Sequence, residues 1–127
     1  MGAQTSTRLR SDDGKVNSVH SLSNWNTQFQ SSKTSNKLMV IDFSAAWCGP
    51  CKFIEPAVND LAVEFSDVDF VRIDVDELPN DLKQDVAKYF DVQAMPTFVL
   101  VKKGKERERF VGIKTDELHR MIEKHRF

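Results

Sequence analysis

Residues 40–52 read VIDFSAAWCGPCK, an apolar run that leads directly into the two cysteines of the chain. Cys48 and Cys51 are three positions apart, so their thiols can close a disulfide and open it again. A Cys-x-x-Cys pair after an apolar strand, with no second pair, is typical of a redox motif. Pro50 suits the first turn of a helix, since its missing N–H would have no intrahelical partner there. The stretch therefore predicts a strand followed by a helix that begins at the cysteines.

The predicted helix start indicates which thiol is reactive. Backbone N–H groups and the positive end of the helix dipole favour the thiolate of Cys48 over its thiol. The thiolate is the form that attacks a disulfide, so we interpret the pair as a thiol–disulfide exchange centre. Three other interpretations stay open: a structural zinc site, a purely structural disulfide and two inert buried thiols. Zinc would need four ligands, and a loop this short gives a structural disulfide little stabilising effect.

Length and composition are those of a soluble protein with one domain. The 127 residues include 40% hydrophobic and 29% charged residues, an ordinary balance. The net charge of −1 gives no reason to expect nucleic acid as a partner. The sequence has neither a run of about 20 apolar residues nor a basic start followed by an apolar segment, so we expect no membrane span and no secretory signal. Because both cysteines belong to one motif, we expect a reducing compartment, the cytoplasm.

The first 15 residues are polar and show no periodicity. We expect a flexible tail over residues 1–15, followed by one domain over residues 16–127. Met1-Gly2 followed by Ser6 fits the acceptor pattern for N-myristoylation, which makes Gly2 a candidate lipidation site. One acyl chain gives only marginal membrane binding, and the tail offers no cysteine for palmitoylation. We therefore expect at most weak membrane association.

After the tail, short apolar runs alternate with stretches of helical spacing. Strands are predicted at residues 16–21, 38–43 and 71–75. The run at 38–43, interrupted only by Asp42, suits a central strand covered on both faces. A helix is predicted after the first strand, with Ser23 as its expected N-cap.

Two more helices are predicted before residue 90. One starts at the cysteine motif, and Pro56 predicts a kink in it. A short one opens at Pro79 and Asn80 and is expected to turn three residues inward, namely Leu82, Val86 and Tyr89.

Two further strands are predicted at residues 97–101 and 106–111, and a closing helix begins at Asp116 and Glu117. The second of these strands is heavily charged, which fits an edge strand that discourages pairing with other chains. The predicted order is β-α-β-α-β-α-β-β-α. It implies an α/β fold, with a mixed β-sheet that is parallel at the crossovers and flanked by helices on both faces.

The sequence resembles the thioredoxin family over residues 16–127. Four motifs follow in the family's order and spacing: Val40–Phe43, Trp47–Lys52, Met95–Thr97 and Val111-Gly112. Segments at 43–47, 74–79 and 94–98 further resemble the plant cytosolic h-type group, especially members with an N-terminal extension. The resemblance implies a thioredoxin-like fold and a protein-disulfide reductase that transfers electrons by dithiol–disulfide exchange.

The resemblance also implies a role for each cysteine. Cys48 would attack a disulfide of a target protein, and Cys51 would resolve the mixed disulfide and leave a Cys48–Cys51 disulfide. No bound cofactor is expected, because this disulfide is the redox group and the chain has no Gly-rich dinucleotide motif. The expected electron donor is an NADPH-dependent thioredoxin reductase, with glutathione or glutaredoxin as the alternative. We expect a monomer.

Asp42 is expected to take part in this chemistry. A carboxylate inside an apolar strand is costly to bury in its charged form, so its pKa should rise by desolvation. Such a group near the thiols can accept the proton of Cys51 during resolution. An aspartate at a solvated strand end is the alternative, and the match to the family's buried aspartate favours the proton acceptor. Arg72 replaces a lysine of many relatives, and since arginine keeps its proton, its effect on the pKa of Asp42 stays open.

Further residues match the surface on which relatives bind their substrates. Met95-Pro96 resembles a peptide bond that relatives keep cis, which would expose the Met95 backbone for pairing with an extended target segment. For Val75 and Ile113, ordinary packing in the core or at the rim is the alternative. The resemblance implies supporting roles for Trp47, Gly49, Pro50 and Pro96, and substrate contacts for Val75, Ala94, Met95, Gly112 and Ile113.

Two rival functions remain open: a non-catalytic interaction module on the same scaffold, and a disulfide isomerase or oxidase. The intact cysteine pair and Asp42 favour a catalyst over a scaffold. Gly49-Pro50 supplies no charged side chain to stabilise the thiolate further, which favours a reductant over an oxidant.

Overall fold

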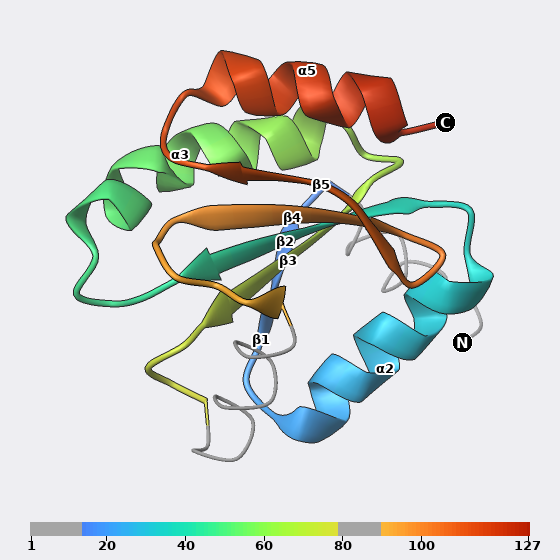
Figure 1. The fold of residues 1–127 in the computed structure, drawn as a ribbon, viewed down its shortest axis with the longest axis horizontal. Coiled ribbons are helices and arrows are strands. Elements are labelled where there is room, and N and C mark those ends of the chain that lie inside the picture. The colour runs from blue at the N-terminus through green and yellow to red at the C-terminus, as the bar shows by residue number, and fades with distance from the viewer. Residues whose placement is uncertain (1–13, 79–89) are drawn as a thin grey trace, which may run out of the picture.

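The computed structural model describes residues 14–78 and 90–127, which form a β-sheet with helices on both faces (Figure 1). The Gly2 site, most of the predicted tail and the predicted helix at Pro79, with Leu82, Val86 and Tyr89, lie outside the described residues. The strands are β1 (Val16–Val19), β2 (Leu38–Ser44), β3 (Asp69–Asp74), β4 (Thr97–Lys102) and β5 (Lys105–Val111). The described helices are α2 (Leu22–Thr34), α3 (Gly49–Glu64) and α5 (Thr115–His125).

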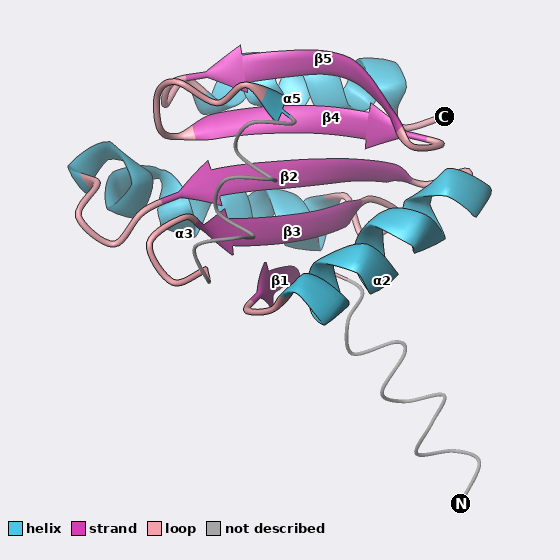
Figure 2. Ribbon diagram, turned by 60° about the horizontal axis from the view of Figure 1, so that its bottom comes forward, coloured by secondary structure: helices cyan, strands magenta, loops and turns pink. Residues whose placement is uncertain are grey.

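The strands form one mixed sheet in the order β1-β3-β2-β4-β5, which Figure 2 shows from edge to edge. β3 pairs in parallel with β1 and β2, whereas β4 runs antiparallel to β2 and β5. The predicted mixed sheet is confirmed, and the heavily charged strand β5 lies at an edge, as its composition predicts.

β2 lies at the centre of the sheet, and its residues 38–43 are all buried. Successive side chains of a strand point to opposite faces. Val40 accordingly packs in the core on the side of α3 and α5, whereas Ile41 packs in the core on the side of α2. Figure 2 shows these helices on opposite faces of the sheet. Asp42 occupies the next position of β2 on the α3 side.

Several predicted boundaries were wrong by one or two residues. β1 ends before residue 21, because Ser21 is the N-cap of α2: its hydroxyl accepts a hydrogen bond from the Asn24 N–H at 3.1 Å. Ser23, the expected cap, lies inside the helix. β3 ends one residue earlier than predicted, so Val75 belongs to the loop that follows the strand.

Four strands begin or end at the same end of the sheet. Ser44 of β2 pairs with Asp74 of β3. On the other side of β2, Phe43 pairs with Thr97 of β4, which pairs in turn with Val111 of β5. The loops that follow β2, β3 and β5 therefore meet the loop that precedes β4. These loops contain the cysteine motif, Val75, Gly112-Ile113 and Met95-Pro96.

Candidate active site

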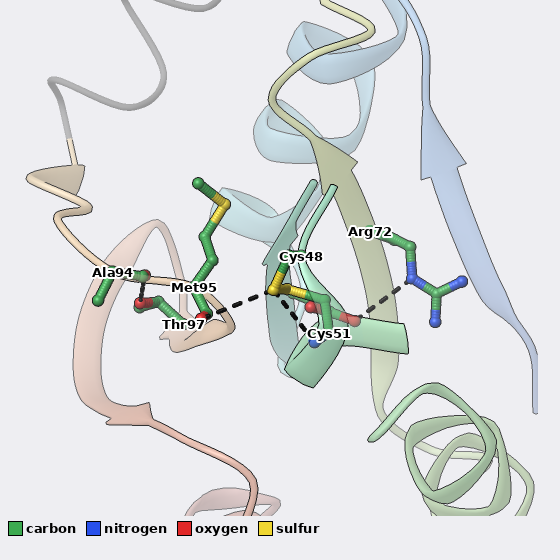
Figure 3. The surroundings of a disulfide bond; sticks show 7 residues. Cys48, Cys51, Arg72, Ala94, Met95 and Thr97 are labelled. Carbon is green, nitrogen blue, oxygen red and sulfur yellow. Dashed lines mark hydrogen bonds and ion pairs between the residues drawn. A yellow bond between two sulfur atoms is a disulfide. The ribbon is translucent and has the colours of Figure 1, made fainter. Parts of the chain in front are cut away.

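Cys48 is the N-cap of α3, and the helix begins at Gly49 with Pro50 in its first turn, as the sequence predicts. A disulfide joins Cys48 to Cys51, with their Cα atoms 5.3 Å apart (Figure 3). The backbone N–H of Cys51 donates a hydrogen bond to Sγ of Cys48 at 3.1 Å. This N–H and the positive end of the helix dipole stabilise a negative charge on Cys48 once the disulfide opens.

The two cysteines lie in an apolar environment. Each is 4% exposed, they form a buried cluster with Ala45, and Val75 and Met95 pack against this cluster. Sγ of Cys48 lies 3.7 Å from the carbonyl oxygen of Met95, which can accept a hydrogen bond from the Cys48 thiol in the reduced form. The backbone of Met95 therefore borders the reactive sulfur.

The loop before β4 is tied to the segment after β5. The Met95–Pro96 peptide bond is cis, as the resemblance implies. The Thr97 hydroxyl donates to the carbonyl of Ala94, and the Gly112 N–H donates to the carbonyl of Pro96 at 3.2 Å. Gly112 has a φ of +126°, which residues with a side chain rarely adopt, so this position favours glycine.

The predicted site residues thus come together at one end of the sheet, around an exposed rim. Trp47 is 70% and Ile113 is 43% exposed, and Gly49, Pro50 and Ala94 are exposed as well. Ala45 and Thr97 also belong to the site, although neither was among the expected site residues. Both lie in segments that carry the resemblance, which were the available signal for them.

Asp42 is a buried carboxylate, 4% exposed. Burial raises its pKa from 3.8 to about 6, because the charged form loses its hydration, and Arg72 opposes part of this rise. Nε of Arg72 donates to Oδ2 of Asp42 at 3.3 Å from the paired position on β3. The predicted rise of the Asp42 pKa through desolvation is therefore confirmed. The sequence left the effect of Arg72 on this pKa open, and in the structure Arg72 lowers it.

Arg72 lies between two carboxylates. Its side chain is 18% exposed, and Nη1 lies 3.9 Å from Oε1 of Glu55 on α3. Its Nη2 is buried and has no hydrogen-bond partner within the described ranges. In the same ranges the Asp42 carboxylate accepts a hydrogen bond from Arg72 and none from either cysteine.

Among residues 14–78 and 90–127, no group of three or more His, Cys, Asp or Glu side chains is placed to hold a metal ion. No helix in the part of the chain that the structure describes has the length and apolar character to cross a membrane.

Comparisons with known proteins find plant thioredoxins. The thioredoxin family model matches residues 16–124. Thioredoxin H2 of Arabidopsis thaliana is 53% identical over 120 residues, 94% of this chain and 86% of that protein. Thioredoxin H2-2 of Oryza sativa subsp. japonica is 54% identical over 111 residues, 87% of this chain and 79% of that protein. The crystal structure of thioredoxin NaTrxh from Nicotiana alata is 56% identical, with a TM-score of 0.82 over 89% of this chain and 94% of that one.

Proposed function

Because this chain belongs to the thioredoxin family, we propose that it is a protein-disulfide reductase in which Cys48 attacks and Cys51 resolves. Thiol–disulfide oxidoreductase activity is common to the family, and the redox group of this chain is the Cys48–Cys51 disulfide, without a bound cofactor. One observation carries the division of roles. The sulfur of Cys48, at the start of α3, accepts the N–H of Cys51 and is thereby the sulfur best able to hold a negative charge.

The first step is an attack of the Cys48 thiolate on a target disulfide. The target S–S bond breaks, an S–S bond forms between Cys48 and the target, and the other target sulfur leaves as a thiolate. Cys51 then loses its proton and attacks Sγ of Cys48, which releases the second target sulfur. Two electrons have passed to the target, whose two released thiolates take up the proton lost by Cys51 and the proton that Cys48 had released to solvent, so that the target leaves as a dithiol.

Asp42 is the proposed acceptor of the Cys51 proton. A pKa of about 6 suits a group that takes up and releases a proton near neutral pH. Asp42 lies on the α3 side of β2, and Cys51 is one of the buried residues of α3. Within the described residues the carboxylate accepts no hydrogen bond from either cysteine in the disulfide form, so we propose that the proton passes through an intervening water.

The proposed docking surface for targets surrounds the disulfide. The backbone of Met95 borders Sγ of Cys48 and suits pairing with an extended target segment. Trp47, Gly49, Pro50 and the cis bond at Pro96 shape this surface. The contacts with the target are assigned to Val75, Ala94, Met95, Gly112 and Ile113.

Members of the family act on disulfide-containing proteins and are reduced by thioredoxin reductase. For this chain we propose an NADPH-dependent reductase as donor, with glutathione or glutaredoxin as the alternative. NADPH gives up a hydride and solvent one proton, so that NADP⁺ leaves and the disulfide becomes a dithiol.

We further propose a monomer with one domain over residues 16–127 and a tail before it, located in the cytoplasm with at most a weakly membrane-associated fraction. The h-type relatives support this location.

An insulin-reduction assay driven by NADPH and thioredoxin reductase tests the proposed function. We expect catalytic precipitation of the insulin B chain and matching consumption of NADPH. If no insulin precipitates although the thioredoxin reductase is active, this chain is not a protein-disulfide reductase. A reduction potential in the range of strong oxidants would point to an oxidase or isomerase instead.

A further inference from the structure

Phe53 is an aromatic side chain that the fold leaves in solvent. It is 73% exposed, whereas the next residue, Ile54, is 2% exposed and packs in the core. α3 is therefore firmly packed at this point, and Phe53 is exposed because it lies on the outer face of the helix. Aromatic residues are enriched at contact surfaces, so Phe53 is a candidate contact residue.

Phe53 lies close to the disulfide along the helix. It follows Gly49 by four positions, so the two share a face and are separated by about 6 Å along the helix axis. Gly49 has no side chain, and a Cβ added there would meet nothing within 4 Å. No side chain at that position separates Phe53 from the rim of the Cys48–Cys51 disulfide. With Trp47, which is 70% exposed, two exposed aromatic residues flank the motif in the sequence.

The position of Phe53 restricts the kind of partner that can reach it. Two residues along a helix correspond to a rotation of about 200°, so Phe53 points away from the side of α3 on which Cys51 is buried. Cys51 shares a cluster with Val75 and Met95, where an extended target segment would pair. A short segment in that place does not reach the outer face of α3. Only a folded surface that covers the start of the helix contacts Phe53 and the disulfide together.

Targets approach the dithiol form of the chain, and the electron donor approaches the disulfide form. Phe53 is exposed while the Cys48–Cys51 disulfide is closed, and the closed form is the one that receives electrons. The folded protein that must approach this form is the electron donor. The neighbouring Lys52 is exposed too, so the fitting surface is an apolar patch with an acidic group at its edge.

We propose that Phe53 extends the docking surface onto the outer face of α3 and contacts thioredoxin reductase when the reductase reduces the disulfide. The proposal rests on the proposed function, which takes that reductase as the donor. Phe53 is a specificity residue in this scheme and takes no part in the exchange of electrons between sulfurs.

Steady-state kinetics with NADPH and thioredoxin reductase test the proposal. In the Phe53→Ala variant we expect the KM of the reductase for the oxidised chain to rise about tenfold, with kcat within twofold of wild type. Phe53→Leu, which keeps an apolar side chain, should restore most of the loss. Val63→Ala is the matched control, because Val63 is 68% exposed on the same helix but lies near its other end, and its KM should equal that of wild type.

Two further measurements separate docking from chemistry. Dithiothreitol is too small to contact Phe53 and the disulfide at once, so it should reduce wild type and both alanine variants at the same rate. If the KM of Phe53→Ala is unchanged while wild type is active, the role of Phe53 is overturned and the proposed function is not affected. A KM that rises only for a protein target of the reduced form would assign Phe53 to targets and also overturn it. A wild-type chain that the reductase fails to reduce would remove the proposed donor and with it both proposals.

Discussion

Cys48 and Cys51 share a disulfide, but their sulfurs have different surroundings. Sγ of Cys48 accepts the Cys51 N–H at 3.1 Å and lies 3.7 Å from the Met95 carbonyl oxygen. We predict that Cys48→Ser abolishes turnover and traps no target, because the stabilised thiolate is lost. Cys51→Ser should instead accumulate mixed disulfides through Cys48. Non-reducing electrophoresis and mass spectrometry of the trapped peptides check this, and trapping through Cys51 in the Cys48→Ser variant would contradict the assignment.

The Asp42 carboxyl makes the free energy of unfolding depend on pH. Its pKa is about 6 in the folded chain against an ordinary 3.8, so the folded state binds this proton more tightly than the unfolded state. The stabilising effect is complete below pH 3.8 and is lost as the pH rises through about 6. At about 1.4 kcal/mol per pKa unit, the whole change is about 3 kcal/mol. Urea unfolding from pH 4 to 7 should show a fall in wild type that is smaller, by most of this amount, in Asp42→Ala.

The same variant separates a catalytic aspartate from a structural one. At pH 7 Asp42→Ala should be more stable than wild type, because a poorly hydrated carboxylate is removed, although Arg72 loses its partner. Its disulfide exchange should be slower, because the proton acceptor for Cys51 is gone. Unchanged exchange rates together with lower stability would indicate a purely structural residue.

At the scale of elements, His119 connects the two helices that cover one face of the sheet. Its Nε2 lies 2.6 Å from Oε2 of Glu64 on α3, and its Nδ1 lies 3.1 Å from Oε1 of Glu123 on α5. The hydrogen bond with Glu64, followed by the charges of both carboxylates, raises the pKa of His119. The ring also packs against Phe65, near Arg126. Protonated His119 therefore holds α5 against α3.

We predict that this contribution is present below the ordinary His pKa of 6.5 and is lost as the pH rises through the raised value. His119→Gln should be less stable than wild type at pH 6, by about 0.5–1 kcal/mol, and similar to it at pH 9. Urea unfolding of both proteins at the two pH values measures the difference. An equal difference at both values would show that the ring acts by packing alone.

Local patterns predicted the interior of the elements better than their ends. The apolar run of β2 and the helix start at Cys48 were both predicted, because each depends on neighbouring residues. The N-cap of α2 was not, since Ser21 and Ser23 are equally suitable and only the hydrogen bond to Asn24 distinguishes them. Val75 is β-branched, which favours a strand, but β3 ends at Asp74 and the chain turns there.

The site was predictable only in part from the residues themselves. The cysteine motif was found directly, whereas the approach of Met95 and Gly112 came from the resemblance to thioredoxins. Contacts of this kind depend on strand register between distant segments, which no local pattern contains. The ion pair of Arg72 with Asp42 is a further case, because 30 positions separate the two residues.

At the scale of the whole molecule, we predict that residues 1–15 influence where the protein resides. Gly2 and Ser6 permit myristoylation, and a single acyl chain gives only marginal, reversible membrane binding. We predict a mostly cytosolic protein with a weakly membrane-associated fraction that disappears in Gly2→Ala. Mass spectrometry of the N-terminus from the native host, with membrane fractionation, measures both. An unacylated Gly2 would leave residues 1–15 without a role in localisation.

β5 has a further consequence for how the protein behaves at high concentration. One side of this strand pairs with β4, and no strand of the described residues pairs with its other side. Residues 105–109 alternate between basic and acidic side chains. Another strand aligned there would have to accommodate this row of charges and would disturb the ion pair between Arg109 and Glu106. Copies of the protein are thus hindered from joining their sheets into larger assemblies. Main-chain pairing stays available beside Cys48, where the proposed target segment meets a sulfur that can react with it.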